Sequence, residues 1–414
     1  MRIFKFGGAS IKNAEGLKNL AEVLHHEGVK DTLLVISAMG KMTNAFENIV
    51  NSYSKKDVDL STNIDFVRNF HLEIVSELFK KEHSIFNETE VLLGELDGFL
   101  ITNKNKDYSF IYDQLVGFGE LLSTKIVSAY LNEIGIFNSW IDVRNYIKTD
   151  SNFREALLDW ELTKKNISTL KKDKLLITQG FLGSNNKNET TTLGREGSDF
   201  TAAIFGYCLN AKSVTIWKDV DGVLNADPRE FVNVELLQQI SYNEAIEMAF
   251  YGASVIHPKT LKPLENKKIP LYVRSFNNVK NKGTIVSESQ NEPLNIPCFI
   301  LKQQQILVSI STLDFSFMVE NNLSHIFKIL HMFKLKVNLI QNSAISFSVC
   351  IEDKFDNFQL FIEELESSFK IDFNKNVALY TIRHATNKSV IDIEAKGTVL
   401  LKQVTKETVQ IVVN

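Results

Sequence analysis

Short apolar runs alternate with amphipathic stretches over the first two-thirds of the chain, and this alternation limits the possible folds more than any other feature. Apolar runs of strand length occur at residues 3–6, 33–36, 141–143, 175–178, 214–217 and 269–273. Apolar residues at helical spacing lie between them, as at 17–24, 121–131 and 242–251. Strands rich in Ile, Leu and Val that are separated by helices predict an α/β fold with a mainly parallel sheet flanked by helices.

A second pattern begins after residues 278–297, whose polar and helix-breaking residues predict a linker. The expected elements are strand 306–310, helix 323–333, strands 337–340 and 345–351, helix 358–369 and strand 377–382. This β-α-β-β-α-β order is that of a ferredoxin-like unit. The runs at 399–404 and 408–413 predict a final hairpin. We expect domains at 1–290 and 298–376, and an incomplete second unit at 377–414 that borrows the strand near 299–302.

Composition excludes several classes of protein. Lys and Arg number 46 against 50 Asp and Glu, a net charge of −4 that argues against a nucleic-acid binder. No apolar run reaches the roughly 20 residues that cross a membrane. The first residues enter a strand-like run at once, so we expect no signal peptide. Three widely spaced cysteines favour a reduced, cytoplasmic protein.

Four loops rich in Gly or hydroxyl residues follow four of the expected strands. They are residues 5–10 (Lys-Phe-Gly-Gly-Ala-Ser), 37–44, 180–199 and 217–229. Taken singly, they have ordinary explanations: a tight turn, a helix cap, a solvated loop and an Asp-Gly turn. Ligands of open α/β sheets bind at the carboxyl ends of the strands, so four such loops together favour a nucleotide or phosphate site.

These motifs together resemble the aspartate kinases of the amino-acid kinase family. The resemblance is carried by residues 5–10, 191–199 (Thr-Thr-Leu-Gly-Arg-Glu-Gly-Ser-Asp), 217–229 and 251–258, and by Gly119-Glu120. It implies the amino-acid kinase fold followed by a ferredoxin-like ACT regulatory region. It also implies ATP-dependent phosphorylation of the L-aspartate side chain to 4-phospho-L-aspartate, the first step towards lysine, threonine and methionine.

The same resemblance assigns roles to individual residues. Those expected at the transferring phosphate are Lys5, Gly7, Gly8 and Ser10, with Lys5 and Asp199 catalytic. Those expected to bind aspartate are Thr43, Glu120, Arg195 and Ser198. Those expected to line the ATP site are Lys218, Asp219, Leu224 and Arg229. ATP and Mg²⁺ are implied, without a metal site built from protein side chains.

The chemistry fits these residue types. A side-chain carboxylate with a pKa of about 3.9 is already ionised at neutral pH, so the reaction needs no general base. It needs charge cancellation between this anionic nucleophile and the γ-phosphate, together with in-line positioning. We expect Lys5, Arg229 and Mg²⁺ to cancel the charge.

The chain also departs from the family pattern. Ala9 replaces a threonine, Glu196 a glycine, Lys218 a threonine, Leu224 a common aromatic residue, and Ser254 stands where some members have lysine. We interpret these changes as tuning. Two alternatives stay open: a kinase of glutamate or N-acetylglutamate, and a catalytically weak, ligand-sensing subunit that pairs with an active partner.

The regulatory region departs further. Lysine-sensing relatives carry carboxylates where this chain has Asn338 and Ala344, on either side of Ser343. An ammonium without a carboxylate partner loses a charge-assisted bond of about 1.5–3 kcal/mol. We therefore expect weak lysine inhibition or a different effector. The family habit of pairing ACT regions predicts a homodimer, and the apolar face at 306–310 fits either that contact or an internal core.

Overall fold

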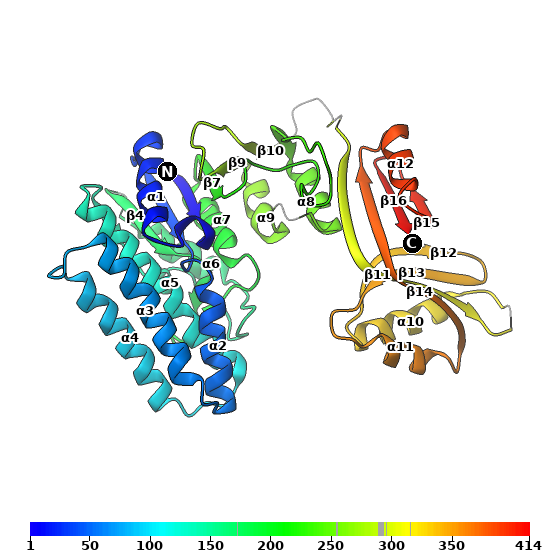
Figure 1. The fold of residues 1–414 in the computed structure, drawn as a ribbon, viewed down its shortest axis with the longest axis horizontal. Helices are drawn as coiled ribbons and strands as arrows, with labels where there is room; N and C mark the ends of the chain where they lie inside the picture. The colour runs from blue at the N-terminus through cyan, green and yellow to red at the C-terminus, as the bar shows by residue number, and fades with distance from the viewer. Residues whose placement is uncertain (172, 254–255, 289–293, 295, 315) are drawn as a thin grey trace. The chain divides into compact units, whose positions relative to one another are not determined.

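The computed structural model describes residues 1–171, 173–253, 256–288, 294, 296–314 and 316–414 (Figure 1). It divides into two compact units. Unit 1 comprises residues 1–223, 236–246 and 256–290, and unit 2 comprises 224–235, 247–255 and 291–414. Residues 224–235 and 247–255, which the sequence analysis assigns to the first domain, are thus grouped with unit 2. Part of the expected linker (289–293 and 295) and Ser254 lie outside the described residues.

Unit 1 is built on an eight-stranded sheet with the order β3-β4-β2-β1-β7-β9-β10-β8. The pairings from β3 to β9 are all parallel, and only β10 runs antiparallel to its neighbour β9. The strands are β1 (Arg2–Phe6), β2 (Thr32–Ile36), β3 (Asn138–Trp140), β4 (Leu175–Gln179), β7 (Ser213–Lys218), β8 (Gln239–Ser241), β9 (Leu271–Ser275) and β10 (Thr284–Ser287). The expected mainly parallel sheet is confirmed.

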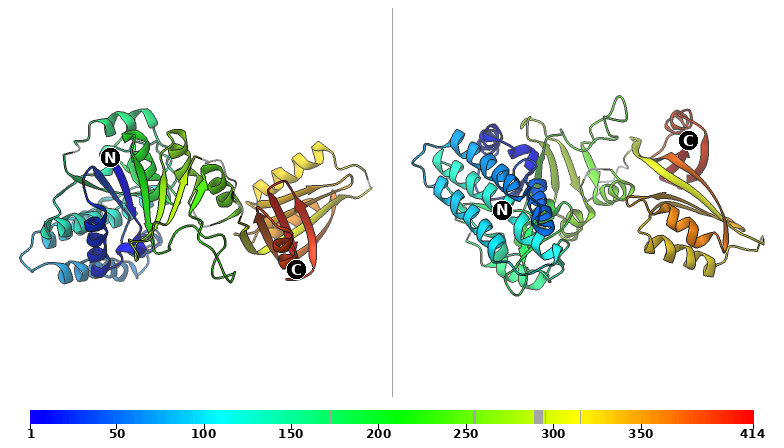
Figure 2. Two further views of the ribbon diagram at one scale, coloured as in Figure 1. Left: turned by 90° about the horizontal axis from the view of Figure 1, so that it is seen from above. Right: turned by 60° about the horizontal axis from the view of Figure 1, so that its bottom comes forward.

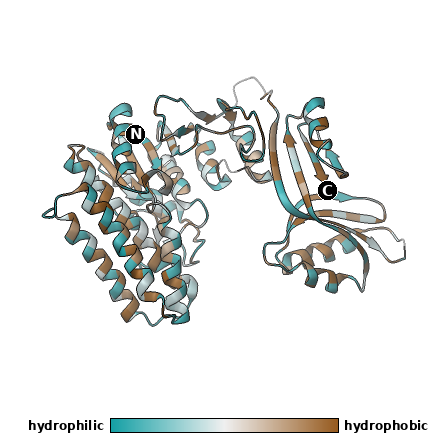
Figure 3. Ribbon diagram, in the orientation of Figure 1, coloured by the Kyte–Doolittle hydropathy of each residue, from teal (hydrophilic) through white to brown (hydrophobic). Residues whose placement is uncertain are grey.

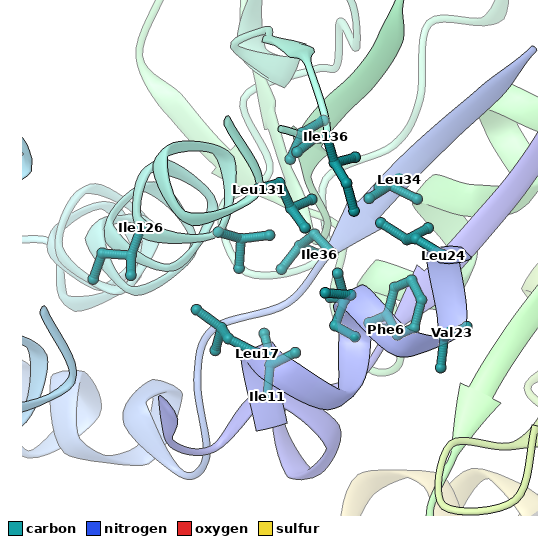
Figure 4. Packing of buried hydrophobic residues seen from close by; sticks show 14 of the residues in the cluster. Phe6, Ile11, Leu17, Val23, Leu24, Leu34, Ile36, Ile126, Leu131 and Ile136 are labelled. Carbon is teal, nitrogen blue, oxygen red and sulfur yellow. The ribbon is translucent and has the colours of Figure 1, made fainter. Parts of the chain in front are cut away.

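Helices cover both faces of this sheet. On one face, α1 (Ala14–Glu27) and α5 (Tyr108–Glu133) pack against Phe6, Leu34 and Ile36 in an apolar core (Figure 4). On the other face, α7 (Gly197–Leu209) contacts β1 and β7. Alternate residues of a strand point to opposite faces, so a strand buried on both faces reads as a continuous apolar run. This explains why β1, β2, β4 and β7 were visible in the sequence.

A layer of long helices extends from the sheet in unit 1. It consists of α2 (Met42–Lys55), α3 (Leu60–Leu78), α4 (Ile85–Thr102) and the first half of α5, which lie side by side in Figure 1. Figure 3 shows apolar and polar bands alternating along these helices. The apolar bands form a separate core around Phe46, Val67, Leu93 and Leu115. The remaining elements of unit 1 are β5 (Leu182–Ser184), β6 (Thr190–Thr192), α6 (Trp160–Ser168), α8 (Tyr242–Tyr251), which continues into unit 2, and α9 (Pro258–Asn266).

Unit 2 contains a six-stranded antiparallel sheet with the order β12-β13-β11-β14-β16-β15. Its elements are β11 (Cys298–Thr312), α10 (Glu320–Met332), β12 (Lys336–Asn342), β13 (Ser346–Glu352), α11 (Phe358–Leu365), β14 (Phe369–Arg383), α12 (Asn387–Glu394), β15 (Val399–Val404) and β16 (Thr408–Val413). The β-α-β-β-α-β order and the final hairpin are confirmed. Ile306, Val308 and Ile310 are buried against α10 and α11, so the apolar face at 306–310 is an internal core.

The two long strands β11 and β14 run through both halves of this sheet (Figure 2). Residues 298–302 of β11 pair with 379–383 of β14, which in turn pairs with β16. The C-terminal half therefore does use the strand near residues 299–302, as expected. The proposed division at residue 376 falls inside the continuous strand β14.

For two segments the sequence-based prediction of secondary structure is wrong. The strand expected at 141–143 lies at 138–140, because the Asp142 side chain accepts a hydrogen bond from the Arg144 N–H and starts a 3₁₀ turn. The linker expected at 278–297 contains β10, whose Thr284 hydroxyl is buried and donates to the Leu237 carbonyl at 2.6 Å. Among the described residues, no helix is long and apolar enough to cross a membrane.

Candidate active site

Four strands of the central sheet end side by side, and a loop follows each of them. Phe6 at the end of β1 pairs with Ile36 of β2 and Trp217 of β7, and Ile36 pairs with Gln179 of β4. Because these strands are parallel, their loops leave from the same edge of the sheet. The expected convergence of the four loops is confirmed.

The first two loops touch through their backbones at Gly8. The Gly40 N–H donates to the Gly8 carbonyl at 2.9 Å, and the Ser37 N–H donates to the Phe6 carbonyl at 3.2 Å. A Cβ atom on Gly8 would lie 2.6 Å from the carbonyl oxygens of Ala38 and Gly40. Glycine is therefore required at position 8 for the two loops to meet.

Gly7 and Ser10 shape the turn that follows β1. The Ser10 N–H donates to the Gly7 carbonyl at 3.0 Å, within a 3₁₀ helix that spans Gly8–Ile11. A Cβ atom on Gly7 would lie 3.3 Å from the ammonium nitrogen of Lys5, which places that ammonium against this turn. A glycine turn beside a cation can hold an anion through backbone N–H groups and charge.

Asp199 lies between two ammonium groups in the first turn of α7. Lys5 Nζ is 2.6 Å from its Oδ1 atom, and Lys218 Nζ is 3.8 Å from its Oδ2 atom. Burial alone would raise the pKa of Asp199, but these two charges outweigh burial and hold the pKa below its ordinary value. The Lys5 ammonium against the Gly7 turn favours an anionic ligand there.

Glu120 of α5 is a buried carboxylate with one oxygen unused. The Ala38 N–H donates to Oε1 at 3.4 Å, and Oε2 has no hydrogen-bond partner within the described ranges. Burial raises the pKa of Glu120 to about 8. An unused buried carboxylate oxygen is costly unless a ligand donates to it, and a cationic donor such as an ammonium fits it best.

The loop before α7 presents a guanidinium to solvent. Arg195 is exposed and makes no hydrogen bond or ion pair with any residue that the structure describes. Its planar fork is therefore available for a carboxylate or phosphate. Ser198 is buried against Gly180, where a Cβ atom would lie 2.4 Å from the Ser198 hydroxyl. Thr43 is half-buried in the first turn of α2.

The remaining predicted residues fall into two groups. Asp219 is exposed directly after β7 in unit 1. Leu224 and Arg229 belong to unit 2. The Arg229 guanidinium is held by the Asp227 carboxylate, with its Nη2 atom 2.6 Å from Oδ2.

Sequence reasoning missed Asp113 and Arg154. Asp113 is fully buried on α5, two helical turns before Glu120, and accepts hydrogen bonds from the backbone N–H groups of Arg154 and Thr192. The available signal was a carboxylate inside an apolar helical stretch, at a spacing that places it on the same face as Glu120. No group of three or more potential metal ligands occurs among the residues described.

Comparisons with known proteins identify the family of this chain. Residues 1–275 match a family model described as the amino acid kinase family. The lysine-sensitive aspartokinase 3 of Escherichia coli is 32% identical over 84% of this chain and 78% of its own length. This chain belongs to the aspartokinases. A bifunctional aspartokinase/homoserine dehydrogenase of Buchnera aphidicola is 31% identical over 89% of this chain, which spans 47% of that relative.

A solved structure of E. coli aspartokinase III, in complex with aspartate and ADP, has the same fold throughout. It covers 100% of this chain and 96% of its own length, with a TM-score of 0.82 and 28% identity. The aspartokinase fold thus includes both units of this chain.

Proposed function

We propose that this aspartokinase transfers the γ-phosphoryl group of ATP to the side-chain carboxylate of L-aspartate, giving 4-phospho-L-aspartate and ADP. This is the first step towards lysine, threonine and methionine. The observation that carries the proposal is the Lys5–Asp199–Lys218 cluster, with Lys5 against the Gly7 turn, together with Glu120 of α5, which contacts the neighbouring loop at Ala38. The E. coli structure with aspartate and ADP supports the same pair of ligands.

The proposal gives each group one task. Lys5, with the N–H groups and hydroxyl of the Gly7–Ser10 turn, contacts the transferring phosphate. Lys218 and Asp219, at the end of β7 in unit 1, line the ATP site, and the family resemblance assigns Leu224 and Arg229 of unit 2 to the same ligand. Glu120 pairs with the ammonium of aspartate and Arg195 with its α-carboxylate, while Thr43 and Ser198 complete the pocket.

Asp199 orients the catalytic lysine in this mechanism. The substrate carboxylate attacks the γ-phosphorus, the bond to the β-phosphate oxygen breaks, and ADP leaves. The main barrier is repulsion between anions, which Lys5 and Lys218 lower at fixed positions. Asp199 holds both ammonium groups in place before the substrates arrive.

Mg²⁺ enters this proposal as part of the Mg–ATP substrate. Asp199 is the buried carboxylate beside the phosphate turn, and two ammonium groups already neutralise it. Mg²⁺ commonly keeps several waters and binds substrate phosphates with only one or two carboxylates. The residues present therefore fit an ion carried by ATP, where it would cancel phosphate charge.

The test is formation of acyl phosphate from Mg–ATP and L-aspartate, trapped with hydroxylamine as the hydroxamate. Lys5→Ala and Asp199→Ala should each lower the rate on the order of 10³-fold, as expected for groups that stabilise transition-state charge. Lys18→Ala, an exposed lysine on α1, is the matched control and should keep the wild-type rate. Equal rates in all four proteins would refute the assigned cluster.

We also propose that lysine is a poor effector of this chain. Asn338 is already engaged, because the Lys302 ammonium donates to its Oδ1 atom at 2.7 Å and its Nδ2 donates to Gln305 at 2.7 Å. Burial, with a smaller effect from Lys336, lowers the pKa of Lys302 to about 8. The chain's own lysine thus occupies the acceptor that a free ammonium would need. Ser343 and Ala344 are exposed in the following turn.

The proposal includes a homodimer formed through the ACT-like regions. The supporting feature is the strand β12, which lies at one edge of the sheet in unit 2 and exposes Ile340. An open, partly apolar edge strand is suited to pairing with a second chain. Light scattering of the full chain should then give twice the protomer mass.

A further inference from the structure

Asp113 is a buried carboxylate that the proposed mechanism does not use. It lies on α5 and accepts hydrogen bonds from three donor groups. The Thr192 N–H donates to Oδ2 at 2.8 Å and the Thr192 hydroxyl to Oδ1 at 2.8 Å. The Arg154 N–H lies 3.1 and 3.0 Å from the two oxygens. Burial raises the pKa of Asp113 to about 6, against the effect of these donors, so it is ionised at neutral pH and can accept from all three donor groups.

Both donors belong to segments next to the predicted aspartate-binding residues. Thr192 ends β6, three residues before Arg195. The Ala156 N–H donates to the Thr192 carbonyl at 2.9 Å, which ties the Arg154 segment to the same strand. A Cβ atom on Gly194 would lie 3.3 Å from the Arg154 carbonyl, so this segment also packs against the residue before Arg195.

Arg154 extends the network to the helix that carries Thr43. Its guanidinium lies over the Tyr112 ring at 4.4 Å and 3.7 Å from Oε1 of Glu47. Glu47 stands one turn after Thr43 on α2. Arg154 also has a φ of +73°, a left-handed conformation that costs a non-glycine residue on the order of 1 kcal/mol. The contact with Asp113 holds this strained backbone in place.

We propose that Asp113 is a positioning residue for aspartate recognition. It touches no substrate. It fixes the segment that leads to Arg195 and, through Arg154 and Glu47, the first turns of α2 with Thr43. Substrate carboxylate and hydroxyl contacts then form without reordering a loop, which lowers the entropic cost of binding aspartate. This inference rests on the proposed function, because it takes aspartate as the ligand of Arg195.

The test compares Asp113→Asn with Asp107→Asn. Asp107 caps the same helix, is exposed and accepts a hydrogen bond from the Ser109 N–H at 3.1 Å, so it is a matched control. In Asp113→Asn the new NH₂ group faces N–H donors. We expect the KM for aspartate to rise about tenfold, the size of one lost hydrogen bond to a charged group, while kcat and the KM for ATP change little.

Thr192→Val is the second variant. It removes only the hydrogen bond from the Thr192 hydroxyl to Asp113, so it also serves as the test if Asp113→Asn does not fold. A rise confined to the KM for aspartate in either variant supports the inference. Unchanged KM values, or equal rises in the KM for aspartate and for ATP, would overturn it and leave Asp113 a purely structural residue. Absence of aspartate-dependent activity in the wild type and in Asp107→Asn would instead refute the proposed function.

Discussion

Buried carboxylates show most clearly what individual residues contribute to this site. Glu120 and Asp199, like Lys5, are candidates that the sequence singles out, because each stands in a short, recognisable stretch. Asp113 could not be singled out in this way, because its partners Arg154 and Thr192 are 41 and 79 residues away in the chain. A sequence read without the fold gives no reason to join such distant positions.

Glu196, a departure from the family pattern, also has a partner that the sequence alone does not indicate. At this position a glutamate replaces the glycine of the family pattern, in a loop beside the site. The structure shows φ +53° at Glu196, a left-handed conformation that explains the glycine of relatives. Its carboxylate accepts the His257 N–H at 2.8 Å. The Glu196 carboxylate thus links two loops, and no local sequence pattern indicates this contact.

Glu120 should make aspartate binding dependent on pH. Its pKa, raised to about 8, means that the free protein holds a proton on this carboxyl at neutral pH. Binding an ammonium requires the ionised form and should release that proton. The KM for aspartate should therefore fall as pH rises towards about 8 and then level off. Calorimetry in two buffers of different ionisation enthalpy should detect the proton, and Glu120→Gln should abolish its release. A KM independent of pH below 8 would contradict this role.

At the scale of elements, the segments that could be predicted from the sequence are those that the structure buries most completely. β1, β2, β4 and β7 are buried on both faces and read as apolar runs. The helices α3 and α4 were not anticipated, since each buries only part of its surface and exposes residues such as Phe66, Val91 and Ile101. Helices of this kind depend on neighbours for their stability more than on their own pattern.

Contact between the first two loops should depend on Gly8. Gly8→Ala would place a methyl group 2.6 Å from two backbone oxygens, so the loops must separate. We expect loss of most hydroxamate-forming activity. Gly94→Ala, on α4 with nothing within 4 Å of the new Cβ, is the control. It should keep activity and raise the free energy of unfolding by about 0.5–1 kcal/mol, measured by urea denaturation. Full activity in Gly8→Ala would show that the loops need not touch.

At the scale of the whole chain, the presence of two units could be predicted from the sequence, but not which segments of the chain belong to each unit. The sequence gives a linear boundary near residue 290. In the structure, residues 224–235 and 247–255 join unit 2 through contacts such as the hydrogen bond from the Phe299 N–H to the Asn225 carbonyl at 2.7 Å. A unit assembled from separated segments leaves no single change of composition to detect.

The regulatory unit leads to a prediction about the whole enzyme. Because Lys302 occupies the Asn338 oxygen, L-lysine should inhibit weakly in a hydroxamate assay at subsaturating aspartate. Lys302→Met with Asn338→Asp removes the internal ammonium and restores a carboxylate, so this pair should increase sensitivity to lysine. Strong inhibition of the wild type at sub-millimolar lysine would contradict the proposed occupancy.

The most direct test of the central claim compares three acids in one hydroxamate assay with Mg–ATP: L-aspartate, L-glutamate and N-acetyl-L-glutamate. In the proposed site Glu120 pairs with a free ammonium, which N-acetyl-L-glutamate lacks. The prediction is hydroxamate from L-aspartate alone. Product from either of the other acids at a comparable rate would contradict an aspartate kinase. ATP binding without product from any of them would favour a ligand-sensing subunit.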